Sequence, residues 1–173
     1  MGEQIVLSFF VDLREIDICL GKKLTPTNQI EFGHQILSFL NSTSLNQTNR
    51  VRIHLNTKSH IIDISPMLSV PPSVNEFVSL LHECLLKSEI RVGGVKVMWV
   101  RKNPLPIPEN SYVLSPYSNK TCNPEIIVSK SADFVLSLNP SDTNEVCFSH
   151  YPLSVLNQSA LIVSAYESSL NII

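Results

Sequence analysis

The residues best suited to chemistry lie near the end of the chain, in the segment Phe148–Ser154 (FSHYPLS). This polar and aromatic stretch precedes an amphipathic pattern that predicts a helix over Ser154–Leu170. An irregular link of this kind exposes backbone N–H and C=O groups that can bind the edge of an adenine ring, and the following helix N-terminus offers unpaired donors. An ordinary strand-to-helix connection, with Pro152 and an N-cap at Ser154, explains the same residues without a ligand.

Other signatures of catalysis and ligand binding are absent from the sequence. The five glycines form neither GxGxxG nor GxxxxGK[ST], which excludes a Rossmann fingerprint and a P-loop, and neither HExxH nor GxSxG occurs. The four cysteines form no CxxC pair, so we predict no metal site. The histidines outside the C-terminal segment are scattered, and we interpret them as surface or structurally hydrogen-bonded groups; they are His34, His54, His60 and His82.

The composition indicates a folded domain without an excess of basic charge. Hydrophobic residues make up 43% and charged residues 16% of the 173 residues, so we predict a single globular domain over residues 1–173. No apolar run approaches the roughly 18 residues that span a bilayer, and we expect no membrane association. The net charge of −2 weighs against nucleic-acid binding, which usually uses a basic surface.

Strand and helix patterns alternate and predict an α/β domain with a largely parallel sheet. The predicted strands are Ile5–Val11, Val51–Leu55, His60–Ile64, Val95–Val100 and Ala132–Leu138. The predicted helices are Gln29–Leu40, a segment that begins at Ser73, and Ser154–Leu170. Glu76 stands three residues after Ser73, which is the pattern of a capping box. Three prolines predict an extended loop over Lys102–Asn110.

Two stretches of the chain resemble the pseudouridine-N1-specific SPOUT methyltransferases of small-subunit ribosome biogenesis. The tail shares their Ser-x-Tyr-Pro-Leu-Ser core at Ser149–Ser154, the number of residues that follow it, and Glu167. An earlier stretch keeps the family register without a gap; it comprises Ile62–Pro66, Pro71, Phe77, Leu80 and Ile90-Arg91, and Lys102-Asn103-Pro104 follows it. The resemblance covers about residues 24 to 173.

The resemblance implies a SPOUT-type domain with a C-terminal trefoil knot that forms a homodimer through the last helix. It implies S-adenosylmethionine as cofactor, no metal, and methylation of a pseudouridine at N1 in small-subunit ribosomal RNA. Pre-ribosomal assembly factors are implied as partners, in the nucleolus or nucleus, or in the cytoplasm of a prokaryote. The family motifs assign no catalytic residue here. The implied cofactor-binding residues are Leu114, Leu136, Phe148, Ser149, His150, Tyr151, Pro152, Leu153 and Ser154.

Some positions depart from the family pattern. Leu136 replaces a Gly, and its side chain is expected to obstruct the cofactor pocket. The family's phosphate-binding arginines and its Arg-Pro-Asp triplet are replaced; the residues here are Ser69, Pro72, Glu76 and Thr27-Asn28-Gln29. Pseudouridine must lose a ring proton, and a nearby cation should stabilise the resulting charge. We therefore keep two hypotheses: an active methyltransferase, and a non-catalytic ribosome-assembly scaffold. An unrelated α/β binding domain would require the tail match to be chance.

Overall fold

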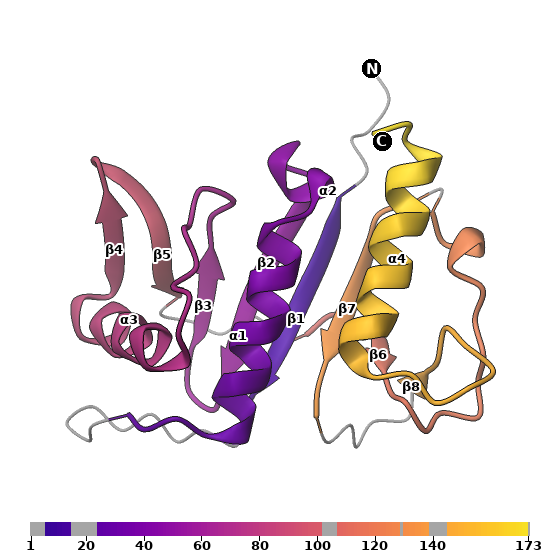
Figure 1. Cartoon of the computed structure of the whole chain (residues 1–173), viewed down its shortest axis with the longest axis horizontal. Helices are drawn as coiled ribbons and strands as arrows, with labels where there is room; N and C mark the ends of the chain where they lie inside the picture. The colour runs from indigo at the N-terminus through magenta and orange to yellow at the C-terminus, as the bar shows by residue number, and fades with distance from the viewer. Residues whose placement is uncertain (1–5, 15–23, 102–106, 129, 139–144, 173) are drawn as a thin grey trace.

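The computed structural model describes residues 6–14, 24–101, 107–128, 130–138 and 145–172, and one sheet runs through them in the order β4-β5-β3-β2-β1-β7-β6-β8 (Figure 1). The strands are β1 (Leu7–Leu13), β2 (Val51–Thr57), β3 (Ile61–Ile64), β4 (Glu89–Val92), β5 (Val95–Arg101), β6 (Tyr112–Leu114), β7 (Ala132–Leu136) and β8 (Glu145–Val146). The helices are α1 (Asn28–Asn41), α2 (Ser44–Gln47), α3 (Val74–Lys87), the 3-10 helix η1 (Pro124–Ile126) and α4 (Val155–Ser169).

The sheet has a parallel part and an antiparallel part. β1 pairs in parallel with β2 and β7, and β6 pairs in parallel with β7 and β8. β3, β5 and β4 extend the sheet from β2 by antiparallel pairing. Four of the seven strand pairings are therefore parallel, which confirms the predicted α/β architecture with a largely parallel sheet.

The α-helices lie on one face of the sheet, with α1 in front of the β1–β2 region and α4 in front of β7 and β6 (Figure 1). Successive strand residues point to opposite faces, so β1 sends Phe9 and Val11 into the main core beneath the helices. Phe10, between them, joins Val113 and Val135 in a smaller cluster. Burial of the helix-facing apolar side chains supplies most of the driving force for this arrangement.

The longer predicted elements are confirmed. Ser73 Oγ accepts from the Glu76 backbone N–H at 3.3 Å, and the Glu76 carboxylate accepts from the Ser73 backbone N–H, which completes the predicted capping box. The predicted strands Val51–Leu55 and His60–Ile64 correspond to β2 and β3, which pair as an antiparallel hairpin. The sequence patterns did not reveal β4, β6 or β8, which have only four, three and two residues. The predicted loop over Lys102–Asn110 lies partly outside the described residues.

A buried charged cluster joins the two parts of the sheet. His54 Nδ1 lies 2.6 Å from Asp63 Oδ1, and Arg101 Nε donates to the other Asp63 oxygen. Burial alone would raise the pKa of Asp63, but hydrogen bonds from His54 and Arg101, together with the charges of these partners, lower the pKa below its ordinary value of 3.8. Phe10 stacks on the His54 ring with centroids 4.8 Å apart. His54 is therefore a structural histidine, as the sequence analysis predicted.

Within the described residues, no helix has both the length and the apolar character needed to cross a membrane. Cys84 is fully buried in the main core, and burial raises the pKa of its thiol to about 11.

Candidate functional site

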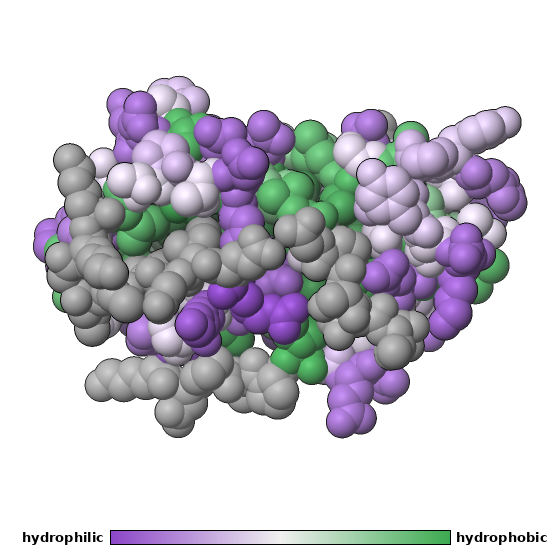
Figure 2. Space-filling view, turned by 90° about the horizontal axis from the view of Figure 1, so that it is seen from below, coloured by the Kyte–Doolittle hydropathy of each residue, from purple (hydrophilic) through white to green (hydrophobic). Residues whose placement is uncertain are grey.

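The implied cofactor-binding residues lie at or after the ends of three strands, β6, β7 and β8, that end at one edge of the sheet. Leu114 of β6 is the register partner of both Leu136 of β7 and Val146 of β8, so the carboxyl ends of these three parallel strands lie in one row. Open α/β sheets bind ligands at the carboxyl ends of their parallel strands. This edge lies at the bottom of Figure 1, and Figure 2 views it directly; side chains of intermediate hydropathy stand out on its right-hand part.

The loop between β8 and α4 is held at both ends by one buried side chain. Gln158 of α4 accepts a hydrogen bond from the Phe148 backbone N–H at 3.2 Å and donates to the Leu153 carbonyl at 3.0 Å. Gln158 is completely buried, so these bonds form away from competing water. Ser154 then caps α4 by accepting from the Asn157 backbone N–H at 3.2 Å, which confirms the predicted N-cap. The loop is thus closed by helix α4.

Phe148 connects this loop to the core. Its ring meets the edge of Phe134 with centroids 6.4 Å apart, and Phe134 stacks on Phe9 of β1 at 5.3 Å. Tyr112 stacks on Phe134 at 5.6 Å. A row of aromatic rings therefore anchors the start of the loop to β1, β6 and β7.

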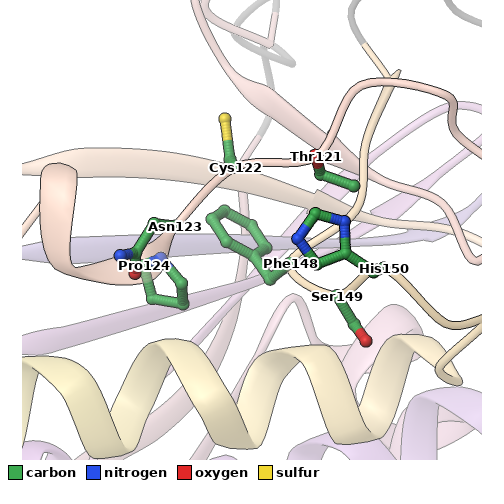
Figure 3. Close-up of a pocket in the computed structure, with 7 residues that line it drawn as sticks. All are labelled: Thr121, Cys122, Asn123, Pro124, Phe148, Ser149 and His150. Atoms are coloured by element: carbon green, nitrogen blue, oxygen red, sulfur yellow. The ribbon is translucent and has the colours of Figure 1, made fainter.

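Two hollows of about 400 Å³ each flank the loop, within the range of ligand pockets. The first is lined by Thr121, Cys122, Asn123, Pro124, Phe148, Ser149 and His150 (Figure 3). The second is lined by Pro116, Tyr117, Ser118, Asn119, Thr121, Cys147, Ser149, His150, Tyr151 and Pro152. Thr121, Ser149 and His150 line both hollows and form a shared wall.

The predicted site residues separate into three groups. Phe148, Ser149, His150, Tyr151 and Pro152 line one or both hollows. Leu153 and Ser154 line neither hollow, and they hold the loop and cap the helix. Leu114 and Leu136 are fully buried and also line neither hollow. The loop after β6, residues 116–124, supplies most of the remaining lining. Because this loop has no periodicity or motif, only the strand end before it, at Leu114, could be predicted from the sequence.

Leu136 is part of the hydrophobic core and does not line either hollow. Its side chain belongs to the main core, and its backbone pairs with Val11 on one side and Leu114 on the other. Replacing it with glycine would therefore remove core packing as well as any obstruction.

The residues at the family's arginine positions have local roles here. Glu76 is bound to Ser73 in the capping box. Thr27 caps α1 by accepting from the Ile30 backbone N–H at 3.3 Å. Gln29 is buried, and among the described residues no donor reaches its Oε1. Within the residues that the structure describes, no three His, Cys, Asp or Glu side chains lie close enough together to hold a metal ion.

Comparisons with known proteins identify the family and the fold of this chain. The model of the EMG1/NEP1 methyltransferase family matches residues 31–167. The protein "Ribosomal RNA small subunit methyltransferase nep-1" of Caenorhabditis elegans is 30% identical over 161 residues, covering 81% of this chain and 68% of that protein. The crystal structure of Archaeoglobus fulgidus Nep1 bound to S-adenosylhomocysteine has the same fold, with a TM-score of 0.66 and 15% identity over 82% of this chain and 71% of that one. This chain belongs to the EMG1/NEP1 methyltransferase family.

Proposed function

We propose that this protein is an S-adenosylmethionine-dependent methyltransferase that modifies N1 of a pseudouridine in small-subunit ribosomal RNA. The observation that carries the proposal is the loop Phe148–Leu153, held by Gln158 at the edge where three parallel strands end. The relative in C. elegans is named as a small-subunit ribosomal RNA methyltransferase, and the relative in A. fulgidus is bound to S-adenosylhomocysteine. The choice of N1 of a pseudouridine rests on the resemblance of the tail motif.

The first hollow suits the cofactor. Its lining combines neutral polar side chains, Thr121, Asn123 and Ser149, with the apolar ring of Phe148, as expected for a small-molecule site with a few orienting polar groups. When bound, the cofactor supplies a methyl group carried on a positively charged sulfur. No lysine or arginine lines either hollow among the described residues, so this positive charge would meet no repelling side chain there.

The shared wall suits the proton transfer. Methyl transfer requires the cofactor and the target nitrogen to be in direct contact, at about 3–3.5 Å. The two hollows adjoin at Thr121, Ser149 and His150, so the methyl group and the target nitrogen would have to meet beside these residues, past the edge of the shared wall. As the N1–methyl bond forms, the proton on N1 must leave, and the imidazole of His150 is the basic side chain on this wall. We expect His150→Asn to lower kcat about 100-fold. Because His150 also lines the first hollow, S-adenosylhomocysteine affinity should fall as well, but by much less than kcat.

The second candidate function is a non-catalytic scaffold of ribosome assembly. It is favoured by the loss of cations at Ser69, Pro72 and Glu76, and by the use of Glu76 as a helix cap. Losing one charge-stabilising group at an active site costs on the order of 10²–10³ in rate. A scaffold would bind pre-ribosomal partners without transferring a methyl group.

The remaining parts of the proposal concern assembly and location. We propose one domain in which the chain after Tyr151 threads an upstream loop as a trefoil knot, and a homodimer formed through α4, acting in the nucleolus or nucleus, or in the cytoplasm of a prokaryote. Leu161 on α4 is exposed, whereas Val163 is buried within the protomer. Leu161→Asp is therefore the variant that should give monomers in sedimentation, while Val163→Asp would disrupt folding.

The test is methyl transfer measured with labelled S-adenosylmethionine and a stem-loop RNA that carries one pseudouridine. The proposal predicts incorporation of label that is lost when the pseudouridine is replaced by uridine. Label incorporation into both RNAs would contradict the N1 specificity. Cofactor binding without any incorporation would favour the scaffold.

A further inference from the structure

The two loops at the second hollow share a local structure. The segments Ser115–Tyr117 and Ser149–Tyr151 both have the pattern Ser-x-Tyr and follow the adjacent strands β6 and β8 closely. In each, the backbone N–H of the tyrosine donates to the serine hydroxyl, at 3.3 Å for Tyr117 and 3.0 Å for Tyr151. Turns closed by a serine side chain hold the backbone in a defined bend. Each tyrosine is thus placed by its own turn.

The two tyrosine rings are left in solvent. Tyr117 is 83% exposed and Tyr151 is 78% exposed, and both line the second hollow. Tyr166, by contrast, is completely buried, and Tyr112 packs on Phe134. Within the described residues, neither exposed ring contacts another aromatic ring. Tyrosine presents a large flat surface at a small entropic cost, so a pair of exposed rings at one hollow is suited to binding a flat ligand.

The other side chains that line this hollow are uncharged, apart from the single imidazole of His150. Besides the tyrosines, the polar lining comes from Ser118, Asn119, Thr121, Ser149 and His150. A site without lysine or arginine offers little to a phosphate group, whereas a π face can stack on any base. Unpaired RNA bases are commonly bound by stacking on aromatic side chains.

We propose that Tyr117 and Tyr151 form an aromatic clamp that holds an unpaired base of the RNA at the second hollow by stacking. The inference rests on the proposed function for the identity of the ligand, because a methyltransferase must bring its target base beside the cofactor. The clamp opens onto the wall that His150 shares with the first hollow. In this chain Ser69, Pro72 and Glu76 replace the family's arginines, and the clamp supplies RNA affinity in their place. Affinity that comes from stacking depends little on salt.

The experiment uses the full chain and a fluorescently labelled stem-loop RNA with an unpaired pseudouridine, measured by anisotropy. Tyr117→Leu and Tyr151→Leu keep apolar bulk but remove the π face, and the matched Tyr117→Phe and Tyr151→Phe keep the ring. Ile126→Ala, at an exposed residue that lines neither hollow, controls for surface changes. Calorimetry with S-adenosylhomocysteine is carried out on every variant.

We expect each leucine variant to weaken RNA binding about tenfold, and the phenylalanine and Ile126 variants to stay within twofold of the wild type. S-adenosylhomocysteine affinity should be unchanged in the Tyr117 and Ile126 variants, which lie outside the implied cofactor-binding residues, and in the Tyr151 variants it should fall by less than RNA affinity does. RNA binding that is unaffected by both leucine substitutions overturns the clamp. Loss of S-adenosylhomocysteine binding with RNA binding intact also overturns it, because the rings would then hold the cofactor's adenine. If no variant, the wild type included, binds S-adenosylhomocysteine while RNA binding follows the expected pattern, the clamp stands and the methyltransferase proposal fails.

Discussion

The antiparallel and parallel parts of the sheet use polar side chains in opposite ways. At the antiparallel side, His54, Asp63 and Arg101 are bonded to one another, and the Asp63 side chain is only 4% exposed. At the parallel edge, His150 and Tyr151 are exposed beside two hollows. A histidine alone therefore does not mark a site. A partnered and buried histidine stabilises the sheet, whereas an exposed one at a hollow is available to a ligand.

The largest effect is expected from Leu136→Gly, which tests whether this residue serves the core or blocks the cofactor. Leu136 is completely buried in the main core, so the variant should lose about 4 kcal/mol of unfolding free energy from the cavity and the flexible backbone. Urea denaturation measures this loss. If the side chain also obstructs the cofactor, S-adenosylhomocysteine should bind the folded fraction more tightly. Unchanged affinity would show that Leu136 is only a core residue.

Asp63→Asn should cost about 3 kcal/mol at pH 7, because the Arg101 guanidinium loses its ion-pair partner and His54 Nδ1 loses the carboxylate beside it. The folded-state pKa of Asp63 lies below its unfolded value, so the contribution of the carboxylate is complete above about pH 4 and is lost as the pH falls through the folded value. The difference between variant and wild type should therefore shrink in acid. S-adenosylhomocysteine affinity should not change.

Glu89→Gln is the matched control for Asp63→Asn. Hydrogen bonds from Lys96 and Arg91 lower the pKa of Glu89 as well, but this cluster lies on the exposed surface of the β4–β5 hairpin. Exposed ion pairs contribute little to stability, so we expect no resolvable change. Equal losses in the two variants would mean that burial does not distinguish them.

Gln158→Met should affect both stability and binding. It leaves the buried Phe148 N–H and the Leu153 carbonyl without their bonds, at a cost of about 2 kcal/mol. Because the loop loses its anchor, S-adenosylhomocysteine affinity should fall at least tenfold. Ser159→Ala is the control, since Ser159 is equally buried on α4 but bonds within the helix, to the Val155 carbonyl at 2.9 Å. Equal affinities in the two variants would contradict the anchoring role.

The smallest effects concern Ser69 and Glu76, two of the positions at which the family carries arginines. Ser69→Arg should raise RNA affinity and steepen the slope of log affinity against log salt by about 0.7 to 0.9 for one added phosphate contact. Glu76→Arg should do the same and also cost about 1 kcal/mol, because it breaks the capping box. Anisotropy across a salt series measures both slopes. A steep slope in the wild type would reveal a basic surface elsewhere on the protein and would favour an active enzyme.

Local sequence patterns were sufficient for the elements that are stabilised locally. The Ser73–Glu76 capping box and the Ser154 cap need only neighbours in sequence, and both were predicted. β6 and β8 have only three and two residues, and they form because neighbouring strands supply their hydrogen bonds. A sequence pattern of that length cannot be recognised.

Contacts between distant residues account for most of what sequence reasoning missed. Asp63 and Arg101 are 38 residues apart and meet only through strand pairing. The burial of Leu136 in the core, away from the two hollows, depends on which face of β7 the helices cover. The loop Phe148–Ser154 was found from its motif, but its second anchor, Gln158, is an ordinary helical residue in the sequence.

The loop held by Gln158 at the parallel edge is expected to bind the cofactor. Isothermal titration calorimetry of the wild-type protein with S-adenosylhomocysteine tests it most directly, with Gln158→Met and Ser159→Ala measured alongside. We expect the wild type and the Ser159 variant to bind one molecule per chain saturably, and the Gln158 variant to bind at least tenfold more weakly. A folded wild-type protein that shows no binding at millimolar S-adenosylhomocysteine would contradict it.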